Sequence, residues 1–396
     1  MKDTYRERIK EEQKKLSPQQ VFFSEGYQRL FQHLADEVAG EKLEQLLLYQ
    51  NASDGIAGWN DGKRIGINVD NAITGSFLEL EQKSDSLVGI LGHECGHAKF
   101  TDSRLRRVYI QKMQAGTWYP DAPETENEDE ESALAEINTY LTKKDPAVLS
   151  LLTECASYIS NLLNDVYIEE KMCSLFPGSI KKGILVNRRR NVEWIPPLKE
   201  LLEGNPDPVS VFLKVLVQYA LRGYVNSWNM ESCEMLDTLN EVKQLVDLSV
   251  EADSDLIRYK ATNRILLKMW KYFRKLLEEL KQECQEPEEN GEQQQETQEQ
   301  PPEKETPQEE QPGKESSDEP SEKEKWKAEA QENGCGEELT EEQQKKMESA
   351  MDKYLKELTE NLPAFIQESE AEEKALPDIE NARIIQVSKR SEDQKE

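Results

Sequence analysis

Apolar residues recur mostly at helical spacing through the first 280 positions of this 396-residue chain. Residues 1–50 are therefore predicted to be helical, with a charged amphipathic segment running from Leu34 to Leu48. A long helix is predicted from about Val148 to Phe176, and only helices are predicted from Ile184 to Leu280. The pattern indicates a predominantly helical protein.

One stretch departs from helical spacing. Between Ile56 and Val69, two short β-prone runs flank the segment Asn60-Asp61-Gly62-Lys63. An Asp-Gly pair in that place is typical of a β-hairpin turn. The hairpin could be purely structural, or it could supply an edge strand on which an extended peptide substrate pairs.

The composition changes after Gln282. The following residues are rich in Glu, Gln, Pro and Lys and cannot bury enough apolar surface to offset chain entropy, so a disordered linker is predicted. Helical spacing returns from Glu341 to Leu362, and a short apolar segment from Ala382 to Val387 precedes a polar end. A helix behind such a linker suggests a docking element, or the lead-in to an absent domain. The expected divisions are a core at 1–180, its helical completion at 181–282, the linker at 283–340, and a C-terminal helix and tail at 341–396.

Charge and cysteine usage limit the function classes. The formal net charge is −29, which argues against non-specific binding to a nucleic-acid backbone, and the basic run from Asn187 to Arg190 is too short to reverse that. No stretch approaches the length of a membrane span, and the charged N-terminus does not look like a signal peptide. The six cysteines form no CxxC pair, which favours reduced thiols. We therefore expect a cytoplasmic protein without nucleic-acid or membrane partners.

The most specific chemical signal is an HExxH motif, in which His93, Glu94 and His97 lie in a segment predicted to be helical from Leu87 to Phe100. Histidines four residues apart share one helix face, so both imidazoles can bind one metal ion, and the intervening glutamate lies beside the open coordination position. The predicted cofactor is Zn²⁺, with His93 and His97 as ligands. Glu94 is the predicted catalytic base, which takes a proton from water and passes it to the leaving amine.

Four small residues accompany the motif. Gly89, Gly92 and Gly96 lower helix propensity in this segment, and they are expected where another backbone or a ligand approaches closely. Cys95 is expected to be a buried small residue and not a ligand.

A third protein ligand must come from elsewhere, because the only other histidine, His33, is expected to be a surface or packing residue. A carboxylate is the best remaining donor. Asn161, Asp165 and Glu169 repeat every four residues beside the apolar stripe of the predicted second helix, where uncompensated carboxylates are costly. A metal would compensate them, and the alternative is a solvated acidic face. Asp165 and Glu169 are thus the candidate third ligands.

The order of these segments resembles known families. The HExxH helix followed by a carboxylate-bearing helix resembles the gluzincin branch of the zinc metallopeptidases. The segments GWNDGKRIGIN, GHECGHAKFTD and NLLNDVYIEEKMCSLFPG are similar to bacterial and phage predicted metallopeptidases that carry a von Willebrand A domain and are distantly related to cobalt-chelatase-type subunits. The resemblance covers roughly residues 50–180, with weaker similarity to about residue 280. It implies an α+β, mostly helical fold with a zincin-like core and a small hairpin or sheet before the HExxH helix.

In that family the second motif typically has an acidic pair before a basic residue and Ile-Glu. Here Asn164 stands at the first acidic position and Tyr167 at the basic one, whereas Asp165, Ile168 and Glu169 match. The resemblance implies Asp165 as the third zinc ligand, and Glu169 as an alternative ligand or as a residue that orients a histidine. No Asp-x-Ser-x-Ser motif follows the linker, so the adhesion domain is expected to be missing.

Two functional hypotheses follow. In the first, the protein is a zinc-dependent peptidase that hydrolyses a protein or peptide substrate with water activated by Glu94. In the second, it is a catalytically silent metal-binding scaffold that meets a protein partner through its linker and C-terminal helix. The intact Glu94 favours the first. A chance HExxH is disfavoured because hairpin, helix and acidic helix occur in the expected order.

Overall fold

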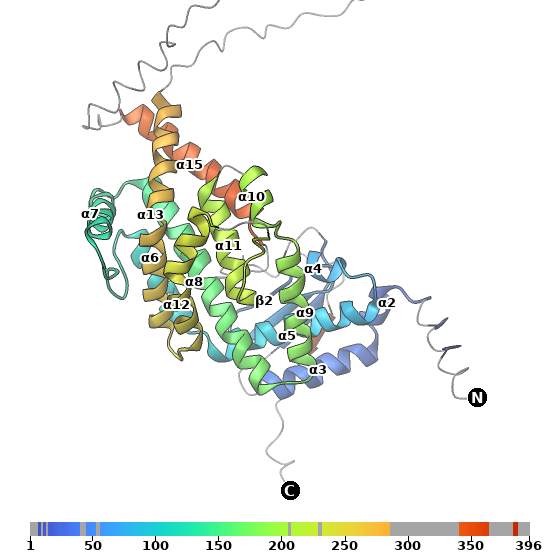
Figure 1. Ribbon diagram of the computed structural model, residues 1–396. Coiled ribbons are helices and arrows are strands. Elements are labelled where there is room, and N and C mark those ends of the chain that lie inside the picture. The colour runs from blue at the N-terminus through green and yellow to red at the C-terminus, as the bar shows by residue number, and fades with distance from the viewer. Residues whose placement is uncertain are drawn as a thin grey trace, which may run out of the picture.

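The computed structural model describes residues 7–8, 11–12, 15–39, 45–52, 56–204, 207–228, 232–285, 340–363 and 383–386. Helices form most of this part of the chain, and a small four-stranded sheet lies at one end of the helical body (Figure 1). The expected mostly helical α+β composition is therefore correct. None of the described helices is both long and apolar enough to cross a membrane.

The sheet has the strand order β2-β3-β1-β4. β2 (Gly58–Asn60) and β3 (Arg64–Asn68) are antiparallel neighbours, so the predicted hairpin is confirmed. Its turn follows from local chemistry: the Asp61 carboxylate accepts hydrogen bonds from the backbone N–H groups of residues 63 and 64, and Gly62 adopts a φ of 85°. β1 (Gln45–Tyr49) pairs with β3 in parallel and with β4 (Arg383–Gln386) in antiparallel fashion.

The prediction that residues 1–50 are all helical is wrong at residues 45–49. The helices α2 (Pro18–Phe22) and α3 (Glu25–Ala39) are present, but the end of the expected amphipathic segment is strand β1. Its residues 46–49 are buried and lie between β3 and β4. A continuous apolar run of this length is typical of a strand covered on both faces, and periodicity alone cannot distinguish it from a buried helix.

The HExxH segment lies in α5 (Leu80–Phe100), which begins seven residues before the predicted start and follows the short helix α4 (Ala72–Gly75). α5 packs against β2 and β3 on one side and against α8 (Pro146–Leu175) on the other. One apolar cluster lies between the sheet, α3 and α5, and a larger one lies among α8 and the helices packed around it. The HExxH helix contributes its apolar side chains to the smaller cluster and packs against α8, most of whose apolar side chains belong to the larger one.

The glycines of α5 lie where other helices approach closely, as expected. A Cβ on Gly89 would lie 2.3 Å from the carbonyl carbon of Gly183 in α9 (Ser179–Glu193), so the two backbones touch. A Cβ on Gly92 would lie 2.6 Å from Ile180 Cγ2, and one on Gly96 would lie 3.0 Å from the Met172 side chain of α8. Cys95, on the same helix, is fully buried as predicted.

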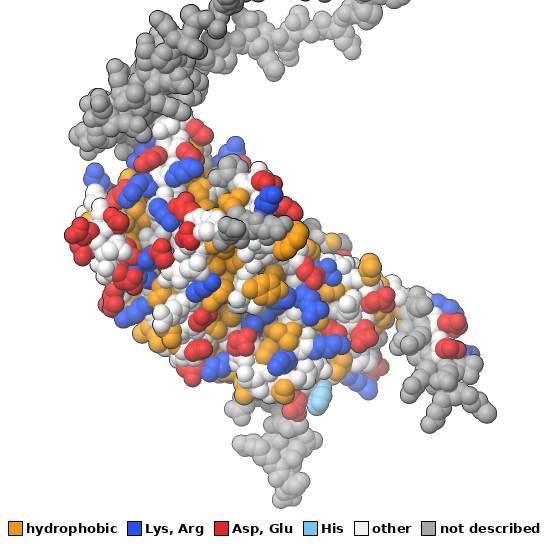
Figure 2. All heavy atoms as spheres, in the orientation of Figure 1, with side chains coloured by type: hydrophobic (Ala, Val, Ile, Leu, Met, Phe, Trp, Pro, Cys, Tyr) orange, Lys and Arg blue, Asp and Glu red, His pale blue; other side chains and the backbone are white. Residues whose placement is uncertain are grey.

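The described region after α8 is mostly helical, as predicted. On the face shown in Figure 2, Lys and Arg side chains gather over α9. After α9 come α10 (Leu198–Gly204), α11 (Pro208–Arg222), α12 (Glu234–Glu251) and α13 (Asp255–Gln285). Two further helices precede α8: α6 (Ser103–Gln114) and α7 (Glu128–Lys143).

The acidic stretch from residue 124 to residue 131 contains the start of α7. Glu130 in the first turn of α7 is buried, and its carboxylate pairs with Lys268 at 2.5 Å and with Arg264, both on α13. Hydrogen bonds from these two cations outweigh the effect of burial and lower the Glu130 pKa to about 2. This acidic residue therefore joins α7 to α13.

The predicted C-terminal helix is confirmed as α15 (Glu341–Asn361). It packs against α8 and α13 of its own chain (Figure 1), and Met347, Met351, Leu358 and Leu362 belong to the larger core. The predicted linker lies outside the described residues from 286 to 339, and its first three residues are the end of α13. α15 thus completes the helical body that carries α8.

Candidate metal centre

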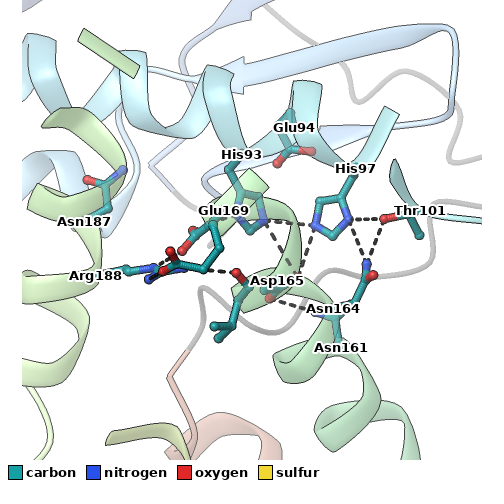
Figure 3. A network of polar contacts seen from close by, with 12 residues as sticks. His93, Glu94, His97, Thr101, Asn161, Asn164, Asp165, Glu169, Asn187 and Arg188 are labelled. Carbon is teal, nitrogen blue, oxygen red and sulfur yellow. Dashed lines mark hydrogen bonds and ion pairs between the residues drawn. The ribbon is translucent and has the colours of Figure 1, made fainter. Parts of the chain in front are cut away.

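The three HExxH side chains project from the middle of α5 into the interior (Figure 3). His93, Glu94 and His97 are at most 5% exposed. The four-residue spacing places both imidazoles on the helix face toward α8, and their Nε2 atoms lie 3.0 Å apart. Two nitrogen donors therefore converge at one point.

A carboxylate from α8 meets them there. Asp165 Oδ1 lies 3.2 Å from His97 Nε2 and 4.0 Å from His93 Nε2, and the aspartate is fully buried. The ligand atoms of these three residues all lie within 4.8 Å of one another, so this buried group can hold a metal ion. In the described part of the chain, no other group of three or more His, Cys, Asp or Glu side chains brings its ligand atoms this close together.

The donor set fits a catalytic zinc site. Two ligand atoms at zinc-bond lengths and a tetrahedral angle lie roughly 3.3 Å apart, and the distances of 3.0, 3.2 and 4.0 Å bracket that value. Two imidazoles and one carboxylate also match the three protein ligands that such sites use, which leaves a fourth position for water. Imidazole and carboxylate suit other divalent transition metals as well.

His93 is oriented by a carboxylate on the opposite side of its ring. Its Nδ1 lies 2.9 Å from Glu169 Oε1, and the other Glu169 oxygen accepts a hydrogen bond from Arg188 Nε. Burial alone would raise the Glu169 pKa, but Arg188 and the His93 hydrogen bond outweigh it and hold that pKa below its ordinary value. Because a charged carboxylate only accepts, His93 donates to Glu169 from Nδ1, and Nε2 is the ring nitrogen that faces the centre.

His97 is oriented by polar groups instead of an acid. Its Nδ1 lies 3.0 Å from the Thr101 hydroxyl, one helical turn later. Asn164 of α8 donates to that hydroxyl at 2.8 Å and lies 3.3 Å from His97 Nδ1. Asn164 thus lies beside the second histidine, as Glu169 lies beside the first.

Asp165 is also held from outside the centre. Asn161, one turn earlier on α8, donates from Nδ2 to Asp165 Oδ2 at 3.3 Å and accepts from Arg106 of α6. The Asp165 oxygen that faces the imidazoles is Oδ1. The hydrogen bond to Oδ2 therefore fixes the rotation of the carboxylate.

Glu94 faces the sheet. Asn60 of β2 donates from Nδ2 to Glu94 Oε2 at 3.0 Å. A Cβ on Gly58 would lie 2.6 Å from Glu94 Oε1, so the absence of a side chain there lets the edge-strand backbone pass directly beside the carboxylate.

The structure gives the predicted site residues different places. His93, His97 and Asp165 converge, Glu94 lies toward β2, and Glu169 contacts the far side of His93 (Figure 3). His33 is exposed, as expected. The sequence reasoning missed four contributors: Asn60 in the predicted hairpin turn, Thr101 at helical spacing after His97, Asn164, and Arg188 in the basic run.

Comparisons with known proteins add no relative: no family model matches the sequence, and no curated protein or solved structure matches the chain. Function is therefore inferred from the residues of this chain and their geometry, without a relative.

Proposed function

We propose that this protein is a zinc-dependent peptidase, with His93, His97 and Asp165 as the zinc ligands and Glu94 as the general base. The observation that carries the proposal is the convergence of both His Nε2 atoms with the Asp165 carboxylate next to an HExxH glutamate. Zinc bound there would lower the pKa of a coordinated water toward neutrality and polarise the scissile carbonyl.

The chain's own groups divide the remaining work. Glu94 accepts a proton on its carboxylate and delivers it to the leaving amine. Asn60 fixes the orientation of that carboxylate through Oε2. Glu169 and Thr101 hold the two imidazoles with their Nδ1 atoms away from the ion. The buried surroundings strengthen each of these electrostatic contacts.

A peptide is the substrate class that the neighbouring strand favours. β2 is an edge strand of the described sheet and pairs there with β3, and β4 occupies the opposite edge beside β1. An extended backbone that hydrogen-bonds along β2 would run past Glu94, because Gly58 of β2 adjoins that carboxylate. The same arrangement would align a scissile bond with the base.

The test uses the full-length chain, because α15 supplies part of the core around α8. Bound zinc is measured, and cleavage of a peptide library is compared for wild type, Glu94→Gln and Glu81→Gln. The last variant is a control on an exposed residue of the same helix. We expect one equivalent of zinc in all three and cleavage by all except Glu94→Gln.

Two outcomes would contradict the proposal. Bound zinc without Glu94-dependent cleavage would leave a metal-binding scaffold, the alternative that relies on the linker and the C-terminal helix. Absence of zinc would remove both functions.

A further inference from the structure

We propose that Arg188 is a positioning residue of the metal centre, which acts on His93 through Glu169. This inference depends on the proposed metal site. Arg188 lies on α9 and contacts none of the three proposed ligands in any described interaction, so its effect has to pass through the carboxylate that lies between it and His93 (Figure 3).

Each of the three guanidinium nitrogens of Arg188 donates a hydrogen bond. Nε donates to Glu169 Oε2, Nη1 donates to Glu170 Oε1 at 2.6 Å, and Nη2 donates to the backbone carbonyl of Val166 at 3.2 Å. All three acceptors belong to α8, the helix that carries Asp165. The planar fork therefore fixes Arg188 relative to the α8 backbone as well as to the carboxylate.

Burying the Arg188–Glu169 ion pair costs desolvation free energy, so a functional reason for keeping it is expected. Arg188 is 4% exposed and Glu169 is 0% exposed, whereas other basic side chains of α9 lie on the surface in Figure 2. A buried ion pair contributes little to stability compared with apolar residues of similar volume. The pair also contacts a histidine: with Arg188 in place, the Glu169 carboxylate stays charged and accepts a hydrogen bond from His93 Nδ1.

The packing of α9 supports the same interpretation. α9 reaches Glu169 because Gly183 and Gly89 allow direct backbone contact with α5. One turn after Gly183, Asn187 donates to the Ser86 carbonyl of α5 at 2.9 Å. Arg188 is the next residue, so its place relative to both helices of the site is fixed by contacts on either side.

A double-mutant cycle in the full-length protein tests the proposal. The variants are Arg188→Met, Glu169→Gln, the double variant, Arg188→Lys, and Arg189→Met as the matched control on the exposed neighbouring residue. Zinc affinity is measured by competition with a chromogenic chelator, the ligand field by the visible absorption of the cobalt-substituted protein, and folding by thermal unfolding.

We expect Arg188→Met to lower zinc affinity by about 10–100-fold and to alter the cobalt spectrum. Arg188→Lys should recover part of the loss, because it keeps a charge beside Glu169. Arg189→Met should behave as wild type. In the Glu169→Gln background, Arg188→Met should lower affinity no further, because the intermediary has already been changed.

The cycle has clear contrary results. Wild-type affinity and spectrum in folded Arg188→Met would overturn the proposal, as would an undiminished loss in the Glu169→Gln background. If Arg188→Met does not fold, the double variant is still testable, since it leaves no uncompensated buried charge. Zinc affinity lower in the double variant than in Glu169→Gln would then overturn the proposal. If wild type binds neither zinc nor cobalt, the metal site itself is wrong, and Arg188 fails with it. If wild type binds metal but Arg188→Met has no effect, only Arg188 fails.

Discussion

Asp165 Oδ1 lies 3.2 Å from His97 Nε2 although 68 residues separate the two side chains in the sequence. Both groups are buried, and His93 Nε2 lies 4.0 Å from the same oxygen. Glu169, the other candidate acid, instead meets His93 at Nδ1. Asp165 and Glu169 therefore lie on opposite sides of the His93 imidazole.

This difference predicts an order of effects on zinc. Asp165→Ala removes a proposed ligand, whereas Glu169→Ala removes only an orienting contact, which typically costs about 10–100-fold in affinity. We expect Asp165→Ala to release zinc at a lower chelator concentration than Glu169→Ala. Chelator titrations of both variants provide the measurement. The reverse order would make Glu169 the ligand.

The Thr101 hydroxyl predicts a second effect on metal affinity. It lies 3.0 Å from His97 Nδ1, so Thr101→Val removes the acceptor with little change in shape, and Thr101→Ser retains it. We expect Thr101→Val to weaken zinc binding by about 10-fold and Thr101→Ser to leave it near wild type. The same chelator titration measures both. Equal affinities would show that the Thr101 hydroxyl does not orient the imidazole.

Much of this centre could be predicted from the sequence, because its signals are local. The four-residue spacings of His93 with His97 and of Asp165 with Glu169 state which side chains share a helix face. The partner of Glu169 could not be found in this way. Arg188 is one of three consecutive arginines, and only the packing of α9 on α5 distinguishes it from its neighbours.

The fold likewise contains elements that a local sequence signal predicts and elements that depend on distant partners. The hairpin has a local turn signal in Asp61 and Gly62, and the sequence predicted it. The side chains of residues 46–49 are all apolar, a pattern that a buried helix could share, and it is the pairing of β1 with β3 and β4 that makes this run a strand. Glu130 is buried because Arg264 and Lys268, more than 130 residues later, neutralise it. The hydrophobic pattern of a short sequence segment shows neither the strand partners of β1 nor the distant cations that pair with Glu130.

The contact between Gly89 and Gly183 predicts a large packing effect. A methyl group at position 183 would meet α5 backbone atoms at 2.3–2.7 Å, and backbone cannot turn aside as a flexible side chain can. We expect Gly183→Ala to lower the free energy of unfolding by at least 1–3 kcal/mol (order of magnitude). Gly26→Ala is the control, since nothing lies within 4 Å of that position in α3, and it should stabilise by about 0.5–1 kcal/mol. Urea denaturation measures both. A neutral Gly183→Ala would mean that the helices can separate at little cost.

The ion pairs of Glu130 predict an acid-dependent part of the stability. Its pKa is lowered from 4.5 to about 2 in the folded protein, so its contribution is complete above pH 4.5 and is lost as the pH falls toward 2. The shift corresponds to about 3 kcal/mol at most. Glu130→Gln should reduce stability at pH 7 and flatten its decline between pH 4.5 and 2. Glu128→Gln, on an exposed residue of the same turn, should keep the wild-type profile. Urea unfolding across this pH range tests the prediction, and parallel curves for Glu130→Gln and wild type would refute it.

The packing of α15 on the chain's own core makes the last prediction. Met351 is fully buried in the cluster that contains the α8 side chains, whereas Lys356 on the same helix is exposed. We expect Met351→Ala to destabilise the protein by about 2–5 kcal/mol and Lys356→Ala to change stability by less than about 0.5 kcal/mol. Because α15 lies against α8, unfolding followed by fluorescence and by zinc release should give one transition in wild type. If Met351→Ala is as stable as wild type, α15 is a detachable element that leaves the proposed metal site intact. A docking role toward another protein would then regain support.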